Sequence, residues 1–261
     1  MNDSAHHFID NGEVRLCLER RGEGLRQVLF AHGWISSRRM WYDVVDRLDP
    51  RAYTSHLLDF RGCGLSDRPR EGHDFPGYTS DLRAALTAIE GPVTLVAHSM
   101  GGKLAQFIAT ERPPNLARLI LVAPGTAKPA RFPEKHRALT LETFGSRERI
   151  ERFQRAAMAA EVTPVQMQRI VDDALVCQYE HWIGWYDRGR DVDFSDRLAA
   201  IEVPTLAIAG GKDPLALAAR VRRDVVGAIH GALFVVLREA GHNLPIEAAS
   251  DVTSAVERFS V

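Results

Sequence analysis

The sequence predicts an α/β fold in which helices cover both faces of a largely parallel central sheet. Along most of the 261 residues, short apolar runs rich in β-branched residues alternate with amphipathic stretches of helical spacing. Several apolar runs have no polar face, which is typical of strands buried on both sides in a parallel sheet. The length suits one large domain or two small ones, and the 45% of hydrophobic residues is enough for a sizeable core.

The expected strands are short runs that end in turn residues, and helical patterns lie between many of them. The expected strands are 27–32, 54–60, 93–98, 116–122, 204–209 and 232–237, and the expected helices are 39–48, 79–90, 100–112 and 215–226. Residues 13–21 alternate in polarity like an edge strand. We therefore expect them to open the sheet in an antiparallel hairpin.

The strand–helix alternation stops after Gly125 and resumes near residue 199. Between these points, apolar residues recur at helical spacing around 150–158 and 167–186. We therefore predict a core formed by residues 1–125 and 199–261, with residues 126–198 as a helical cap. The first half of the cap is rich in Arg and Lys and the second half in acids, which favours helix faces that attract one another over a dedicated anion site.

Composition excludes several classes of partner. The formal net charge is −1, so no general attraction to nucleic acid or to an anionic membrane is expected. No apolar run could span a bilayer and the polar N-terminus lacks a signal-peptide core, so we expect a cytoplasmic protein. Three scattered cysteines indicate reduced thiols. We expect a small-molecule substrate, and the sequence leaves open whether the protein forms homo-oligomers.

The strongest chemical signal surrounds Ser99. An apolar strand runs directly into this serine, and a helical pattern begins at once. A serine at such a corner projects from the carboxyl edge of the sheet and needs small residues two positions to either side. Gly101 meets that need, while Ala97 stands where glycine is usual. Taken alone, Ser99 would be an ordinary helix N-cap.

A second signal is His32-Gly33-Trp34, at the end of the strand predicted at 27–32. Gly33 allows a close backbone turn, so the N–H groups of Trp34 and Met100 could converge on one oxygen. Two such donors form an oxyanion hole. Taken alone, this tripeptide would be only a turn.

Two further polar residues follow the last two expected strands. Asp213 lies in Gly210-Gly211-Lys212-Asp213-Pro214, and His242 lies in the loop after 232–237. Alone, the aspartate would be an N-cap before proline and the histidine a surface residue. Their order after Ser99 is the order Ser…Asp…His stated for α/β-hydrolases.

With these motifs, the chain resembles the α/β-hydrolase superfamily over nearly its whole length. The loop Asp59-Phe60-Arg61-Gly62-Cys63-Gly64-Leu65-Ser66-Asp67-Arg68-Pro69 adds support and is interpreted as structural, with internal hydrogen bonds from Arg61 and Asp67. Within the superfamily, the motifs are most similar to small esterases and to cofactor-free bacterial haloperoxidases (perhydrolases). The resemblance implies acyl transfer by Ser99, with His242 as base and Asp213 orienting it.

Ser99 excludes the branches of the superfamily that use a different nucleophile, and the absence of other motifs excludes other chemistry. Haloalkane dehalogenases and epoxide hydrolases carry an aspartate there, so their alkyl-enzyme ester is not expected. The sequence has no zinc motif and no GxGxxG fingerprint, and Gly102-Lys103 lacks the upstream glycine of a P-loop. We therefore expect no metal and no cofactor.

The cap is expected to roof the substrate pocket. Large apolar surface comes from Trp34, Trp182, Trp185 and Tyr186, although each of them could equally pack the cap onto the core. The expected substrate is a small apolar ester or thioester. A carbon–carbon bond hydrolase, a cofactor-free lyase or dioxygenase, and a hydrolase-like ligand receptor remain as alternatives.

Overall fold

The computed structural model describes residues 5–130 and 134–260, without the side chain at position 136. Within them, eight strands form one sheet in the order β1-β2-β4-β3-β5-β6-β7-β8. The strands are β1 (Ala5–Asp10), β2 (Arg15–Arg21), β3 (Arg26–Ala31), β4 (Tyr53–Leu58), β5 (Val93–His98), β6 (Leu116–Val122), β7 (Thr205–Gly210) and β8 (Leu233–Leu237). The six strands from β3 to β8 are mutually parallel, which confirms the predicted α/β architecture.

The antiparallel part of the sheet lies at its N-terminal edge. β2 pairs antiparallel with β4 on one side and with β1 on the other. The expected opening hairpin is therefore present, but its first strand was not predicted. β1 is almost entirely exposed and carries two histidines and an aspartate among its six residues, so it has no hydrophobic pattern to detect.

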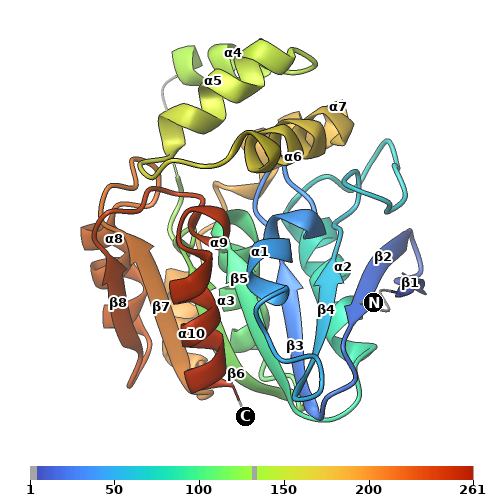
Figure 1. Cartoon of the computed structure of the whole chain (residues 1–261), viewed down its shortest axis with the longest axis vertical. Helices are drawn as coiled ribbons and strands as arrows, with labels where there is room; N and C mark the ends of the chain where they lie inside the picture. Colours follow the sequence, from blue (N-terminus) through green and yellow to red (C-terminus); the bar gives the residue numbers. More distant parts are fainter. Residues whose placement is uncertain (1–4, 131–133, 261) are drawn as a thin grey trace.

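Helices cover both faces of the sheet (Figure 1). The core helices are α1 (Tyr42–Val45), α2 (Phe75–Thr87), α3 (Ser99–Thr110), α8 (Ala218–Asp224), α9 (Leu244–Glu247) and α10 (Ala249–Phe259), with 3₁₀ turns η1 (Arg38–Trp41) and η4 (Val226–Ala228), while the 3₁₀ turn η3 (Ser195–Ala200) spans the end of the cap and the return to the core. α1 and α10 lie on one face, whereas α2 and α3 pack together on the other (Figure 1). β4, β5 and β7 are buried at every position, so the sheet interior forms the main hydrophobic core.

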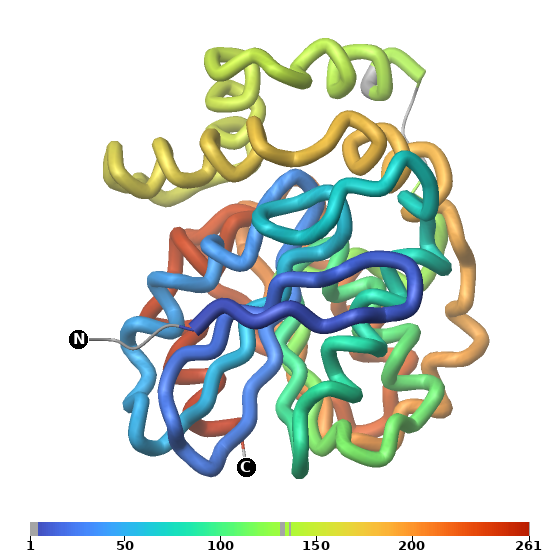
Figure 2. Tube along the Cα trace, turned by 90° about the vertical axis from the view of Figure 1, so that its right-hand side faces the viewer, coloured from blue at the N-terminus to red at the C-terminus, as the bar shows by residue number. Residues whose placement is uncertain are grey.

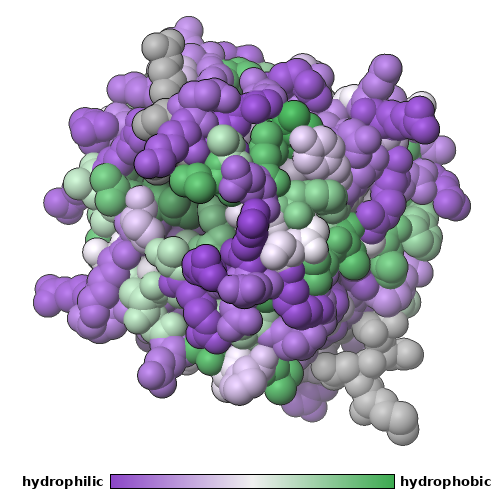
Figure 3. Space-filling model, turned by 90° about the horizontal axis from the view of Figure 1, so that it is seen from above, coloured by the Kyte–Doolittle hydropathy of each residue, from purple (hydrophilic) through white to green (hydrophobic). Residues whose placement is uncertain are grey.

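The described residues of the segment 126–198 include a helical layer above the carboxyl ends of the parallel strands (Figures 1 and 2). It contains α4 (Glu134–Leu141), α5 (Arg147–Ala157), α6 (Pro164–Val176), α7 (Tyr179–Gly184) and the π-helical turn η2 (Trp185–Gly189). We keep the term cap for this segment. Its basic and acidic halves pair as expected, Arg137 with Asp187 at 2.7 Å and Arg147 with Asp172 at 2.6 Å. Hydrophilic side chains cover most of its outer face (Figure 3).

The inner face of the cap packs on two core loops. Trp182 and Cys177 belong to a buried cluster that also contains Ile35 and Cys63 of the core. The two Sγ atoms lie 3.4 Å apart, and the amide of Gln178 donates to the carbonyl of Gly62 at 2.8 Å. Apolar burial of this kind contributes roughly 25 cal/mol per Å². The cap is therefore packed onto the core as a fixed layer.

Buried ion pairs hold the loops beneath the cap. Arg38 bonds to Glu19 at 2.6 Å and to Asp59 at 2.5 Å, and Arg61 donates to both carboxylate oxygens of Asp81. Burial by itself raises the pKa of Glu19, but hydrogen bonds from Tyr42, Arg21 and Arg38 outweigh it and lower that pKa to about 2. Among the described residues, no helix combines the length and the apolar character needed to cross a membrane.

Candidate active site

Ser99 occupies a sharp corner between β5 and α3. Its φ of +49° lies in the left-handed region, which a side-chain-bearing residue adopts only when its surroundings enforce it. Close backbone packing holds Ser99 in this conformation. The packing is so tight that a Cβ on Gly101 would lie 2.6 Å from the carbonyl oxygen of His32. Ala97 at the other flank is fully buried, so one methyl group is tolerated where glycine is usual.

The structure brings His242 and Asp213 to this corner. His242 Nε2 lies 2.9 Å from Ser99 Oγ, and its Nδ1 lies 2.8 Å from Asp213 Oδ2. The second carboxylate oxygen accepts the amides of Leu215 and Ala216 at 2.7 and 2.9 Å. An anionic carboxylate can only accept, so Nδ1 carries the proton and Nε2 presents a lone pair to the serine hydroxyl.

The electrostatics at Asp213 favour that protonation state. Burial raises the pKa of this carboxyl, but the nearby imidazole of His242 and the two backbone amides outweigh burial and hold the pKa below its ordinary value. Asp213 therefore stays ionised at neutral pH. A fixed, ionised carboxylate behind an imidazole can stabilise a positive charge that develops on that ring.

The loop that carries His242 is anchored from both layers. The amide of His242 donates to the carbonyl of Ala157 in the cap at 2.8 Å. From the core, His98 Nε2 lies 2.9 Å from the His242 carbonyl, and burial lowers the pKa of His98 to about 3, so it remains neutral. Glu247 accepts amides from Gly241 and Asn243 and from two cap residues, Ala159 and Ala160. No sequence signal had pointed to Glu247.

The turn at Gly33 is held by the histidine before it. His32 is fully buried, its Nδ1 donates to the Gly33 carbonyl at 2.7 Å, and its Nε2 accepts the amide of Phe60 at 3.1 Å. A Cβ on Gly33 would lie 2.6 Å from His98 Nδ1, so the close approach requires glycine. Trp34 and Met100 both line the pocket above Ser99. Convergence of their amides on one oxygen stays a prediction.

A pocket of about 220 Å³ lies between the cap and the core, with Ser99 and His242 in its wall. Trp34, Trp185 and Tyr186 line it, as do Phe153, Ile170 and Leu215. Trp182 does not. Its side chain is fully buried and packs on Trp34, with ring centroids 5.5 Å apart, and on Phe144. The expectation that Trp182 lines the substrate site is therefore wrong, because this ring fills the cap–core junction behind Trp34.

Lys103 is a pocket residue whose role sequence reasoning missed. Its Nζ donates to the carbonyls of Arg190 at 2.6 Å, Val192 at 2.7 Å and Lys128 at 3.3 Å. Burial lowers the pKa of Lys103 to about 8, against a smaller opposing effect of Asp191 and Asp193. The available signal was its position four residues after Ser99, on the same helix. Lys103 joins that helix to both ends of the cap.

Potential metal ligands gather elsewhere. In the described part of the chain, Cys63, Cys177 and His181 present ligand atoms within 4.8 Å of one another. Burial is the largest influence on two of them, raising the pKa of Cys63 and lowering that of His181. None of the three lines the pocket, so this cluster is separate from Ser99.

Comparison with known proteins shows which family the sequence matches. A model described as the alpha/beta hydrolase family matches residues 28–256. The AB hydrolase superfamily protein YisY of Bacillus subtilis is 28% identical over 269 residues, covering 97% of this chain and 98% of the relative. The non-heme chloroperoxidase CPO-A1 of Kitasatospora aureofaciens is 27% identical over 239 residues, covering 85% and 86%.

The solved structures show the same architecture. The esterase EaEST from Exiguobacterium antarcticum superposes with a TM-score of 0.89 at 24% identity, covering 97% of this chain and 98% of the esterase. At that identity the likeness concerns the fold. The family match is independent of it and covers residues 28–256, which include the cap and the six parallel strands apart from the first two residues of β3, but not β1 and β2. The chain therefore belongs to the alpha/beta hydrolase family.

Proposed function

We propose that this α/β hydrolase is a serine esterase that works through Ser99, His242 and Asp213. The observation that carries the proposal is the continuous chain of contacts from Asp213 Oδ2 through His242 to Ser99 Oγ, at 2.8 and 2.9 Å. Ser99 and His242 both line the largely apolar pocket under the cap. Esterases among the similar structures agree with this reaction type.

In the acylation step, His242 Nε2 takes the proton of Ser99 as Oγ attacks the ester carbonyl carbon. The carbonyl becomes an oxyanion, for which the amides of Trp34 and Met100 are the proposed donors. Asp213 stabilises the imidazolium. Collapse of the intermediate expels the alkoxide, which takes the proton from His242 and leaves an acyl group on Ser99.

In the second step, His242 deprotonates a water molecule, which attacks the acyl carbon. Ser99 leaves as the protonated alcohol and the free acid is released, so the reaction is a net hydrolysis. A second candidate function replaces this water by hydrogen peroxide and releases a peracid. Similarity to proteins named non-heme chloroperoxidase and non-heme haloperoxidase supports this second candidate.

A chain-length series of p-nitrophenyl esters, combined with phosphonate labelling and mass mapping, tests the proposal. We expect turnover that peaks at short to medium acyl chains, and a label on Ser99. Adding hydrogen peroxide and assaying peracid separates the two candidates. Labelling without turnover would instead support a ligand receptor or a different bond type, and a label absent from Ser99 would contradict the proposal.

A further inference from the structure

Three soft donor side chains meet at the junction between the cap and the core. Cys63 lies in the core loop after β4, Cys177 directly follows α6, and His181 lies in α7 of the cap. The two Sγ atoms and a ring nitrogen of His181 lie within 4.8 Å of one another, and the three residues are between 0% and 2% exposed. We call this group the thiol–imidazole cluster. It lies outside the pocket that Ser99 lines.

Hydrogen bonds determine which ring nitrogen of His181 carries a lone pair. His73 Nε2 lies 2.8 Å from the carbonyl of Pro69, and a carbonyl only accepts, so this nitrogen carries the proton. His73 Nδ1 therefore accepts the hydroxyl of Tyr78 at 3.2 Å. The same hydroxyl oxygen accepts the Nδ1–H of His181 at 2.9 Å, which leaves the lone pair of His181 on Nε2. Burial lowers the pKa of both histidines, so both rings are neutral.

This lone pair has no hydrogen-bond partner among the described residues, although His181 Nε2 is buried. The Arg61 backbone carbonyl acts on the ring, but a carbonyl has no proton to give to a lone pair. The Cys177 thiol is a weak donor, and its Sγ lies 3.4 Å from the Ser36 carbonyl and 3.3 Å from the Asp173 carbonyl. A buried acceptor without a donor is costly unless a ligand satisfies it. Two thiols beside a free imidazole lone pair are the donor set that zinc prefers.

The separations within the thiol–imidazole cluster fit a tetrahedral zinc ion. Zn–S bonds of about 2.3 Å at tetrahedral angles place two sulfur atoms about 3.8 Å apart. The Sγ atoms of Cys63 and Cys177 lie 3.4 Å apart, so a small rotation of the side chains is sufficient. Two thiolates and a neutral imidazole balance the charge of a divalent cation, which reduces the cost of burying it. The Ser36 carbonyl is the candidate fourth ligand, because it faces Cys177 Sγ.

We propose that Cys63, Cys177 and His181 bind one Zn²⁺ and that this ion joins the cap to the core. Each thiol loses its proton on binding, so two Zn–S bonds and one Zn–N bond form and two protons are released. Because the cluster lies outside the pocket, the ion holds the cap in place and takes no part in the proposed hydrolysis. The expectation of no metal rested on local motifs, whereas Cys63 and Cys177 are 114 residues apart in the chain.

Cobalt substitution tests the site, because thiolates bound to Co²⁺ give a charge-transfer absorption that free Co²⁺ lacks. The full chain is unfolded with denaturant, reductant and chelator, and is then refolded with Co²⁺, since the folded chain buries the cluster. We expect one Co²⁺ per chain and a thiolate absorption that Zn²⁺ abolishes. Cys63→Ser and Cys177→Ser should each lose at least half of this absorption. Cys17→Ser changes an equally buried thiol of β2 and should keep all of it.

A second measurement remains decisive if a serine variant does not fold. Wild type refolded with Zn²⁺ should unfold at a higher temperature than wild type refolded without it, and His181→Gln should reduce the shift. Absence of both the absorption and the shift in the wild type would overturn the proposal. So would an absorption that both serine variants retain, or Co²⁺ bound without any thiolate absorption. A Cys63–Cys177 disulfide that forms in place of metal binding, detected by mass mapping, would also reject the zinc site.

Discussion

The core and the cap contribute to the pocket in different ways. The core supplies polar side chains from strand ends, with Ser99 after β5, Asp213 after β7 and His242 after β8. The cap supplies aromatic rings and backbone carbonyls. We infer from this difference that the core determines the proposed reaction, and that the cap determines which molecule reaches Ser99. Substitutions in the two layers should therefore separate rate from selectivity.

The largest effect is expected from Ser99→Ala. Loss of the nucleophile should lower kcat by up to about 10⁶-fold, since residual catalysis comes only from binding and oxyanion stabilisation. The free energy of unfolding should change little, because Ser99→Ala removes only one oxygen and leaves the backbone at the same left-handed φ. Steady-state kinetics and urea denaturation check both statements. Activity near that of the wild type in the purified variant would remove Ser99 from the mechanism.

Asp213→Asn should lower kcat by about 10⁴-fold, because an amide in this position favours the wrong imidazole tautomer. His242→Ala removes the proposed general base and should therefore be about as damaging as Ser99→Ala. Asp196→Asn, which alters an exposed aspartate of η3, is a suitable control and should behave as the wild type. Retention of most activity in Asp213→Asn would mean that another carboxylate orients His242.

Two tryptophans of the cap should separate stability from selectivity. Trp182→Ala empties the junction between cap and core and should cost about 3–5 kcal/mol of unfolding free energy, with the preferred acyl chain length unchanged. Trp185→Ala enlarges the pocket wall and should shift that preference toward longer chains. The ester series and chemical denaturation of both variants provide the measurement. A changed chain-length preference in Trp182→Ala would show that the junction also shapes the pocket.

Lys103→Met should loosen the junction by a smaller amount. The variant leaves three carbonyls without their ammonium partner, for a cost of about 1–3 kcal/mol. Hydrogen exchange should rise at 126–130 and 190–193, and KM should rise more than kcat falls. Lys135→Met, on an exposed face of α4, is the matched control. Unchanged hydrogen exchange in both segments would show that the Lys103 ammonium does not hold them together.

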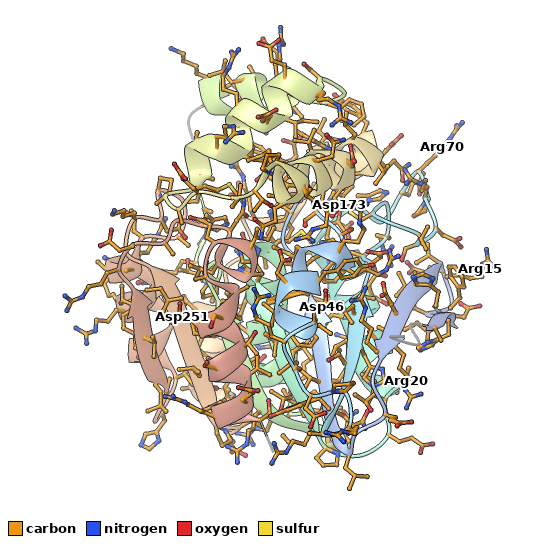
Figure 4. The ribbon with its side chains drawn as sticks, in the orientation of Figure 1. Arg15, Arg20, Asp46, Arg70, Asp173 and Asp251 are labelled. Carbon is orange, nitrogen blue, oxygen red and sulfur yellow. The ribbon has the colours of Figure 1, made fainter. Side chains whose placement is uncertain are left out.

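The smallest effect concerns pH and Asp173, at the contact between α6 and the core (Figure 4). Burial raises the pKa of Asp173 to about 6, although Arg39 and Ser37 oppose it. The native state then holds this proton more tightly than the unfolded chain, so stability from this group falls as pH rises from about 4 to 6. Asp173→Asn removes that dependence. Between pH 4 and pH 7, its unfolding free energy relative to the wild type should rise by about 1–3 kcal/mol. A constant difference would contradict the assignment.

Strand ends could be predicted from the sequence because apolar runs and the turns after them are local patterns. That is why the positions of Ser99, Asp213 and His242 were foreseen. Lys103 and Glu247 were not, because each acts through backbone groups of segments distant in sequence. Trp182 and Trp185 could not be told apart, since η2 is a π-helical turn and a 3.6-residue period does not apply there.

The ammonium of Lys103 touches carbonyls from residues 128, 190 and 192, so the chain leaves the core and returns to it at one point. An inserted segment whose two ends meet can change in length or sequence without moving the strands that flank it. New substrate ranges can then evolve by replacement of the whole cap, while the strand order and Ser99 at the corner between β5 and α3 are inherited unchanged. A chimera that exchanges residues 129–189 between relatives would exploit the same boundary.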